Sequence, residues 1–355
     1  MRKLLLLFLT IFLIPSLLFS ATQLKKTVKS ADGDYTSLSA CMNANEQDLV
    51  SNDKYFDVEI DGVWASEDTT ACIVDNYTTD TTRHINIYTT ATARHDGKWK
   101  ATAYTMKNGS ALHINGVKHV SVTGIQIDLN ETVAGVGIKI SDPDGGHNAV
   151  DILIDKCIIK NGDLTSWTPP SKGFQSGLFT SGCVRNTLIY SVGMGMSDYN
   201  NLGSNAYPAW LFYNCVIRDI PVSGFSNTYG ILYNGTGYTI VNCAVFDVGT
   251  AGNDFGGASL TIFRCASDDG DGTSAVTPAD WDAVFTDQDN GDFSLESTDT
   301  DLTGAGFNLS LTFTDDIIGA TRTSPWDIGA YKAEGGGDIT QAYFIRKKKG
   351  IFFVK

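Results

Sequence analysis

The chain has 355 residues, of which 42% are hydrophobic, and it contains 36 glycines and eight prolines. This composition is typical of a folded protein rich in turns and excludes a disordered one. The formal charge of −14 disfavours a nucleic-acid partner, because binding to phosphates needs basic patches. A polyanionic glycan is also repelled unless a metal ion or a local basic groove reverses the field, whereas a neutral glycan is not.

Residues 1–20 have the layout of a secretory signal peptide. Arg2 and Lys3 precede an apolar run over 4–14, which Pro15 interrupts before the small residues at 20 and 21. A membrane anchor is the alternative, but the run is shorter than the roughly 20 residues that span a bilayer. We therefore expect a protein that is secreted or displayed on the cell surface, with no integral membrane segment after cleavage.

Residues 21–56 are predicted to form an N-terminal cap. Residues 34–37, with Ser37 at the end, precede apolar positions at Leu38, Cys41 and Leu49. This order predicts a helix with a side-chain N-cap and one apolar face.

Residues 57–282 contain a repeat of buried positions. Each copy has two alternating apolar residues, a break of two, and then a marker residue followed by a second alternating pair. Successive markers are 30, 28, 28 and 22 residues apart, and weaker copies at 120–127, 85–92 and 58–63 bring the number to eight. The five strong copies are Ile152, Ile154, Cys157, Ile159; Gly182, Val184, Thr187, Ile189; Trp210, Phe212, Cys215, Ile217; Tyr238, Ile240, Cys243, Val245; and Leu260, Ile262, Cys265, Ser267.

Alternation on both sides of the break predicts two short strands joined by a sharp turn. Asn186, Asn214 and Asn242 stand just before the marker, and asparagine tolerates left-handed backbone. Stacked at one turn, these side chains are expected to form a ladder of amide hydrogen bonds. A third strand precedes each pair, so each turn of the coil has three strands. A helical repeat is the alternative, but the chain lacks long apolar stripes at 3.6-residue spacing.

The fold class predicted is therefore all-β, a right-handed single-stranded parallel β-helix of about eight rungs. Because open sheet edges invite aggregation, the helix in 21–56 is expected to cover the first rung. Residues 283–334 lose the repeat and are expected to cover the last one irregularly. Residues 335–355 form a glycine linker and a basic, apolar tail, which meets an anionic surface or a partner, or simply frays.

Two copies of the repeat resemble a known family. Residues 212–217 read Phe-Tyr-Asn-Cys-Val-Ile and residues 240–245 read Ile-Val-Asn-Cys-Ala-Val. These are similar to the Val-x-Asn-Cys-x-Ile repeats of the secreted β-helix proteins of the pectate-lyase-like superfamily. Residues 326–331, Trp-Asp-Ile-Gly-Ala-Tyr, resemble the closing module of many bacterial and phage-borne members. The resemblance covers roughly residues 32–331 and implies the fold.

The same resemblance leaves the activity open, because the superfamily includes polysaccharide lyases, glycoside hydrolases, phage tailspikes and adhesins. The Gly-His-Gly and paired-aspartate patterns of polygalacturonase-like hydrolases are missing from the sequence. The Arg-x-Pro-x-x-Arg pattern of pectate lyases is also missing, and residues 218–221 match it only in part. These two activities are therefore disfavoured.

Catalytic candidates are the residues expected on the outer face of the groove. A lyase needs a base and a group that stabilises an enolate, and Lys139 or His113 with a calcium ion would supply both. A hydrolase needs two carboxylates roughly 5 to 9.5 Å apart. Asp198 and Asp254 stand about two rungs apart at roughly 4.8 Å per rung. The alternative is that these are solvated surface groups.

Substrate-binding candidates combine polar and aromatic residues near the same groove, because aromatic faces stack on sugars. Trp210 is excluded, since it occupies a buried position of the repeat. The candidates are His113, Trp167, Gln175, Tyr199, Tyr207 and Tyr229.

The acidic run at Asp268, Asp269 and Asp271 has the oxygen ligands that calcium prefers, so calcium is the cofactor considered. It lacks the complete twelve-residue calcium loop, and ordinary turn chemistry is the alternative. Seven cysteines leave one thiol unpaired, and a stack of apolar thiols is the simpler account. If a disulfide forms, Cys41 with Cys72 is the expected pair.

The sequence is compatible with two functions. The first is a secreted protein that engages polysaccharide along its groove, as a lyase, a hydrolase or a binding protein. The second is a structural or adhesive module, associated with a cell surface or a phage, that uses the coil as a rigid spacer. We place polysaccharide engagement ahead on the resemblance.

Overall fold

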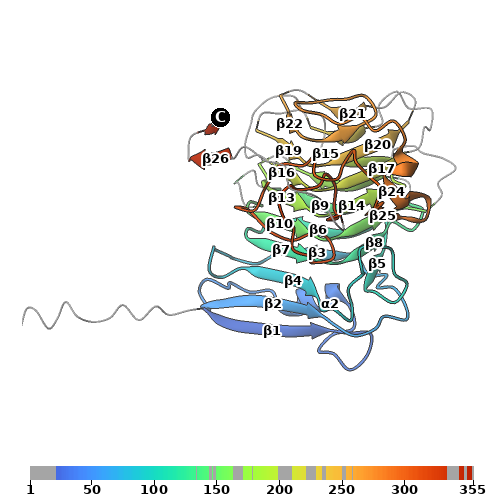
Figure 1. Ribbon diagram of the computed structural model, residues 1–355. Helices are drawn as coiled ribbons and strands as arrows, with labels where there is room; N and C mark the ends of the chain where they lie inside the picture. Colours follow the sequence, from blue (N-terminus) through green and yellow to red (C-terminus); the bar gives the residue numbers. More distant parts are fainter. Residues whose placement is uncertain are drawn as a thin grey trace, which may run out of the picture.

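The computed structural model describes residues 21–132, 134–143, 146, 149–162, 171–177, 179–198, 210–220, 229–233, 237–249, 253–257, 259–333, 344–347 and 350–353. Three parallel sheets wind into a coil, which runs from blue at the N-terminal end to orange at the far end in Figure 1. This is a parallel β-helix, and the predicted fold class is confirmed. The expected signal peptide, residues 1–20, lies outside the described residues.

Sheet 1 contains β1 (Thr22–Val28), β2 (Lys54–Ile60), β4 (Ile85–Thr89), β7 (Val120–Thr123), β10 (Ile152–Asp155), β13 (Gly182–Arg185), β16 (Trp210–Tyr213), β19 (Thr239–Val241) and β22 (Thr261–Phe263). Sheet 2 contains β5 (Thr105–Lys107), β8 (Gln126–Asp128), β11 (Ile158–Lys160), β14 (Leu188–Tyr190), β17 (Val216–Ile220), β20 (Ala244–Val248) and β23 (Ala266–Ser267). Sheet 3 contains β3 (Cys72–Val74), β6 (Ser110–Asn115), β9 (Val136–Ser141), β12 (Lys172–Ser176), β15 (Met194–Asp198), β18 (Tyr229–Leu232) and β21 (Asn253–Gly256).

The repeat read from the sequence is the stacking register of the coil. Ile154 pairs with Val184, Val184 with Phe212, and Phe212 with Ile240, and all four side chains are fully buried. Trp210 is also fully buried, as expected, and its indole packs edge-on against Phe174. Equivalent apolar residues therefore stack on one another inside the coil, which explains why the spacing of apolar residues in the sequence predicts the fold.

The asparagine column forms the turns but not the predicted ladder. Asn186, Asn214 and Asn242 are fully buried with φ between +48° and +56°. Among the described residues, a single side-chain hydrogen bond joins two of these asparagines: Asn242 Nδ2 donates to Asn214 Oδ1 at 3.4 Å. Asn186 donates instead to Asp155 within the coil, whereas Asn214 and Asn242 donate to backbone carbonyls of the C-terminal part of the chain, which lies against them.

The seven cysteines are all free, so the expected Cys41–Cys72 disulfide is absent. The stack of buried thiols is present instead. Each marker thiol donates to a carbonyl of the preceding rung, as Cys243 Sγ does to Phe212 O at 3.6 Å. The marker cysteines are Cys157, Cys215, Cys243 and Cys265.

The N-terminal end is closed by the predicted helix, α2 (Leu38–Ala44). Ser37 caps it by accepting a bond from the Ala40 N–H, and Leu38, Cys41 and Met42 are buried. The cap also holds a strand that the sequence did not indicate, since β1 pairs in parallel with β2 along seven residues.

The C-terminal segment covers a flank of the coil, not its far end. We call residues 284–333 the strap. It includes β24 (Phe285–Asp287), the 3-10 turn η2 (Gln288–Asn290) and β25 (Asp292–Leu295), and the 3-10 turn η1 (Trp281–Ala283) leads into it. The far end is covered instead by the stretch after β23, where Thr273 and Val276 bridge to the last rung.

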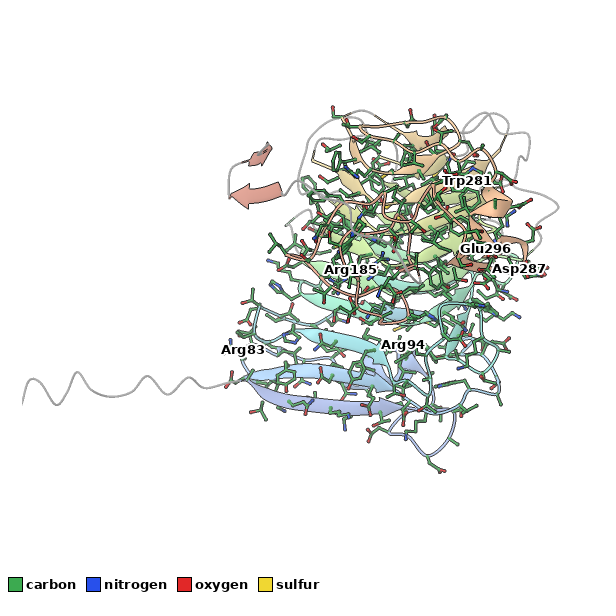
Figure 2. All side chains as sticks on the ribbon, viewed as in Figure 1. Arg83, Arg94, Arg185, Trp281, Asp287 and Glu296 are labelled. Atoms are coloured by element: carbon green, nitrogen blue, oxygen red, sulfur yellow. The ribbon has the colours of Figure 1, made fainter. Side chains whose placement is uncertain are left out.

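The strap lies along the flank because the outer faces there are apolar. Outward residues of sheet 2, such as Leu188 and Val216, are buried beneath Phe285 and Phe293. A second cluster buries Tyr213 and Val241 of sheet 1 beneath a group from the strap. That group is Phe307, Leu309, Phe313 and Trp326. Figure 2 labels Arg185 of β13, whose guanidinium lies over the Phe313 ring at 4.8 Å.

Polar contacts tie the strap to distant rungs. Asn242 bonds the backbone of Phe307 twice, with Oδ1 accepting from its N–H at 2.6 Å and Nδ2 donating to its carbonyl at 2.8 Å. The Tyr331 hydroxyl donates to the carbonyl of Gly97, in a loop after the second rung. Lys156 pairs with Asp315. The strap therefore spans the coil from its early to its late rungs.

A column of glycines marks the junction between sheets 2 and 3. Register places Gly137, Gly173, Gly195 and Gly230 on successive strands. A Cβ at Gly195 would lie 2.3 Å from the Gly230 carbonyl oxygen and 2.6 Å from Ile217 Cγ2. The two sheets approach so closely here that only glycine fits.

Two further strands, β26 (Phe344–Lys347) and β27 (Gly350–Phe353), form an antiparallel sheet of their own. In the part of the chain that the structure describes, no helix is long and apolar enough to cross a bilayer.

Candidate functional site

The candidate site is the outer face of sheet 3. Register places His113 beside Lys139, Lys139 beside Gln175, and Gln175 beside Ser197. The preceding residue of each strand fills the core, as Ile138 and its stacked neighbours do. Alternation therefore sends this row outward, one residue per rung, at a spacing of roughly 4.8 Å.

His113 is held in its neutral form. Burial, together with the charge of Lys139, lowers the pKa of the imidazole. Its Nε2 lies 2.6 Å from Ser141 Oγ, whose proton goes to Asn115 Oδ1 at 2.7 Å. Nε2 therefore carries the imidazole proton and Nδ1 is the acceptor, as a general base requires.

Lys172 joins the same electrostatic network. Burial is the largest effect and lowers the pKa of Lys172; the charge of Asp198, next in size, raises it, and the charge of Lys139 lowers it further. Four titratable groups on β6, β9, β12 and β15 are thus coupled in order along the coil. Such coupling is typical of functional sites, although structural ion pairs produce it too.

Two polar side chains of the row are buried. Gln175 is 3% exposed and Ser197 is 1% exposed. Within the described residues, Ser197 Oγ has no hydrogen-bond partner. A buried hydroxyl without a partner is costly, and such groups occur where a site is arranged for something other than stability.

The structure brings together several of the residues predicted from the sequence. His113, Lys139 and Gln175 share one row. Asp198 does not belong to it, which corrects the prediction that it faces outward with them: at the end of β15 it pairs with Ser176, in the row of the core residue Ile140. It is half-buried, and its charge acts on Lys172. Tyr229 lies on β18, with its ring beside Gly256. Trp167, Tyr199 and Tyr207 lie outside the described residues.

Lys172 is the residue that sequence reasoning missed, although a signal was present. The residue before each column glycine occupies one register row, which contains Val136, Lys172 and Met194. Tyr229, before Gly230, is one of the substrate-binding candidates predicted from the sequence. Aligning the glycines would have added Lys172 as well.

Asp254 does not lie in the outward row of sheet 3, which corrects the expectation that it pairs with Asp198 there. In β21 it takes the place that glycine has in the column, and it is 4% exposed. Its Oδ2 accepts from the Asp268 N–H at 2.7 Å, so the carboxyl holds the stretch that closes the last rung. A hydrolytic pair of Asp198 and Asp254 is therefore not assembled.

Substitution Asp254→Asn is expected to stabilise the protein at alkaline pH. Burial raises the pKa of Asp254 to about 8, so the folded state favours the protonated form. The stability that this supplies is complete below the unfolded pKa of about 4 and is lost as the pH rises through about 8. Relative to the parent, the variant should gain on the order of a few kcal/mol between pH 4 and pH 9.

Thermal unfolding of both proteins across that pH range measures the difference. Asp269→Asn is the control, because it removes only a neighbouring charge that raises the pKa of Asp254, and its gain should be smaller. A difference between parent and Asp254→Asn that does not change with pH would contradict the assignment.

The acidic stretch has no metal-site geometry. In the residues described, no three His, Cys, Asp or Glu side chains are grouped to hold a metal ion. Asp268 Oδ2 accepts from the Asp247 N–H, and Oδ1 accepts from Trp281 Nε1 at 2.5 Å. Calcium at Asp268, Asp269 and Asp271 thus has no support from the geometry.

A scan against protein-family models and searches of the curated proteins and of the solved structures find no match to this chain. The β-helix architecture is established by the sheet topology itself.

Proposed function

We propose that the protein is an exported β-helix that holds a polysaccharide along the outer face of sheet 3. The observation that carries the proposal is the coupled line of His113, Lys139, Lys172 and Asp198 on four successive strands. A straight row with one polar group per rung matches the repeat of a linear polymer. The repeats support kinship with the pectate-lyase-like superfamily, by analogy of fold.

Local charge favours a glycan that carries carboxylates. The chain as a whole is acidic, but two half-buried cations, Lys139 and Lys172, lie together on this face. They supply the local basic groove without which an anionic glycan would be repelled.

Elimination chemistry fits this face better than hydrolysis. His113 Nδ1 would take the proton beside a uronate carboxylate, and Lys139 or Lys172 would stabilise the enolate. The glycosidic C–O bond then breaks, its oxygen takes up a proton, and the new chain end is unsaturated. A hydrolase needs a second carboxylate across the bond, and Asp254 is turned away.

Lys139→Met and Lys172→Met should each weaken glycan binding about tenfold or more, since each removes a partly desolvated charge. The chain from Ala21 is tested against a glycan survey that scores binding and unsaturated ends, with calcium or with a chelator. Lys118→Met, a half-buried lysine outside sheet 3, is the control and should bind like the parent.

Cleavage makes the protein an enzyme, and binding without cleavage makes it a lectin-like module; both agree with the proposal. No binding to any glycan contradicts it. The second candidate, a structural or adhesive module on a cell surface or a phage, is then favoured. The strap supports that alternative, because it fastens early rungs to late ones.

A further inference from the structure

The edge of β1 that faces away from β2 carries unbonded backbone groups. The Thr22 N–H donates to a carbonyl just before β2, and the Val28 carbonyl accepts from an N–H just after β2, so the even-numbered residues of β1 bond β2. The N–H and C=O groups of Gln23 and Lys25 therefore point away from the coil. In the described part of the chain none of these four groups is bonded, and both side chains are exposed. Figure 1 shows β1 as the outermost strand at this end of the coil.

This open edge has a defined length. Thr27 lies on the same edge, but its N–H donates to Asp34 Oδ2 at 2.8 Å and its carbonyl accepts from the Tyr35 N–H at 3.1 Å. The open stretch is therefore confined to residues 22–26. In its middle, Leu24 packs against the core and yet is only half-buried. A second strand placed here would complete the burial of Leu24 and bond the free backbone groups.

The opposite end of sheet 1 is not open in the same way. Thr273 lies against the outer edge of β22, where its N–H donates to the Ile262 carbonyl and its carbonyl accepts from the Arg264 N–H, both at 3.0 Å. A head-to-tail stack, in which β1 of one copy pairs with β22 of the next, is therefore blocked. Two N-terminal ends can still meet, and such a contact closes on itself as a dimer.

We propose that two copies of the chain associate through β1 as antiparallel strands, with Leu24 of each copy at the twofold axis. Gln23 of each copy then pairs with Lys25 of the other, which forms four backbone hydrogen bonds and places no lysine opposite a lysine. An axis at Gln23 would set the amino-terminal charge of Ala21 opposite Lys25. An axis at Lys25 would oppose two lysines and require the edge of Thr27, which is already bonded.

Analytical ultracentrifugation of the chain from Ala21 tests the proposal. A five-residue pairing buries less than the roughly 1,600 Å² of a stable interface, so the dimer should dissociate on dilution. Lys25→Pro removes the N–H on the open edge and should raise the Kd about tenfold or more. Lys25→Gln is the matched control, because it loses the same ion pair with Glu59 but keeps the N–H, and it should dimerise like the parent.

Thermal unfolding at a concentration where the parent is monomeric checks that both variants are folded. Their midpoints should agree, since the β1–β2 ladder does not use the Lys25 N–H.

A cysteine at the axis tests the register. The two Leu24 residues form a non-hydrogen-bonded pair, whose Cα atoms are expected about 4.5 Å apart, within the range of a disulfide. Leu24→Cys should therefore give a covalent dimer under mild oxidation with copper–phenanthroline. Thr22→Cys, which would lie opposite Lys26, should not, and neither should the parent with its own seven thiols.

Three results would overturn the proposal. The first is a parent that stays monomeric at the highest concentration reached. The second is association of Lys25→Pro with the same Kd as the parent. The third is a Thr22→Cys variant that crosslinks as readily as Leu24→Cys.

Discussion

Gly195→Ala is expected to destabilise the coil by about 3 kcal/mol. The added methyl group would lie 2.3 Å from the Gly230 carbonyl oxygen, a backbone atom that cannot rotate away. To make room, β15 and β18 must separate, and their neighbours in sheet 3 must follow. Denaturant unfolding, compared through the midpoint at constant slope, measures the loss.

Ala111→Gly is the matched control, because register places Ala111 in the same column on β6. That change removes a methyl group which the first rung of the column accommodates, and it should cost only about 0.5 to 1 kcal/mol. Equal losses for the two variants would show that the column is not close-packed.

Asn242→Ala should detach the strap and destabilise the protein by about 3 kcal/mol. The change strips partners from both the N–H and the carbonyl of Phe307, each of which is costly to bury unbonded. It also places alanine at φ +56°, a conformation that adds about 1 kcal/mol. Limited proteolysis should then cut within 284–333 faster than in the parent.

Asn186→Ala separates these two effects. Asn186 has φ +48° at the same turn, but its amide donates to Asp155 Oδ1, within the coil. The control therefore shares the backbone strain without touching the strap, and the strap should keep its parental resistance to protease. Faster cutting of the strap in Asn186→Ala would refute the special role of Asn242.

The periodicity of apolar residues is sufficient to predict the coil, because each rung of a β-helix makes the same contacts as the rung before it. Each rung buries side chains against equivalents in the next rung, so Phe212 under Ile240 is visible as a spacing of 28 residues. The α2 helix was equally readable, since Ser37 and the apolar residues after it are local signals.

The strap could not be placed from sequence, because its partners are remote and no period relates them. Nothing near Phe307 indicates Asn242, and nothing near Tyr331 indicates Gly97. Asp254 was misjudged for a related reason. The alternation of inward and outward residues predicts that the Asp254 side chain points outward. In the structure, Asp254 occupies the glycine column, whose positions lie against sheet 2.

The candidate site was partly predictable. His113, Lys139 and Gln175 follow from strand register, which the repeat supplies. The lowered pKa of Lys172 depends on burial and on a neighbouring rung, and both are properties of the folded molecule.

The contact between Tyr331 and Gly97 joins residues 234 positions apart, and this sets an order of events during synthesis. Rungs contact their neighbours, so the coil can assemble from the first rung as the chain leaves the ribosome. The strap is made after the surface it covers. A nascent chain that has completed β20 but has not yet emerged past Trp281 exposes the outer residues of sheet 2 to water and to other chains. For this protein, the interval most open to misassembly lies between the completion of sheet 2 and the synthesis of the strap.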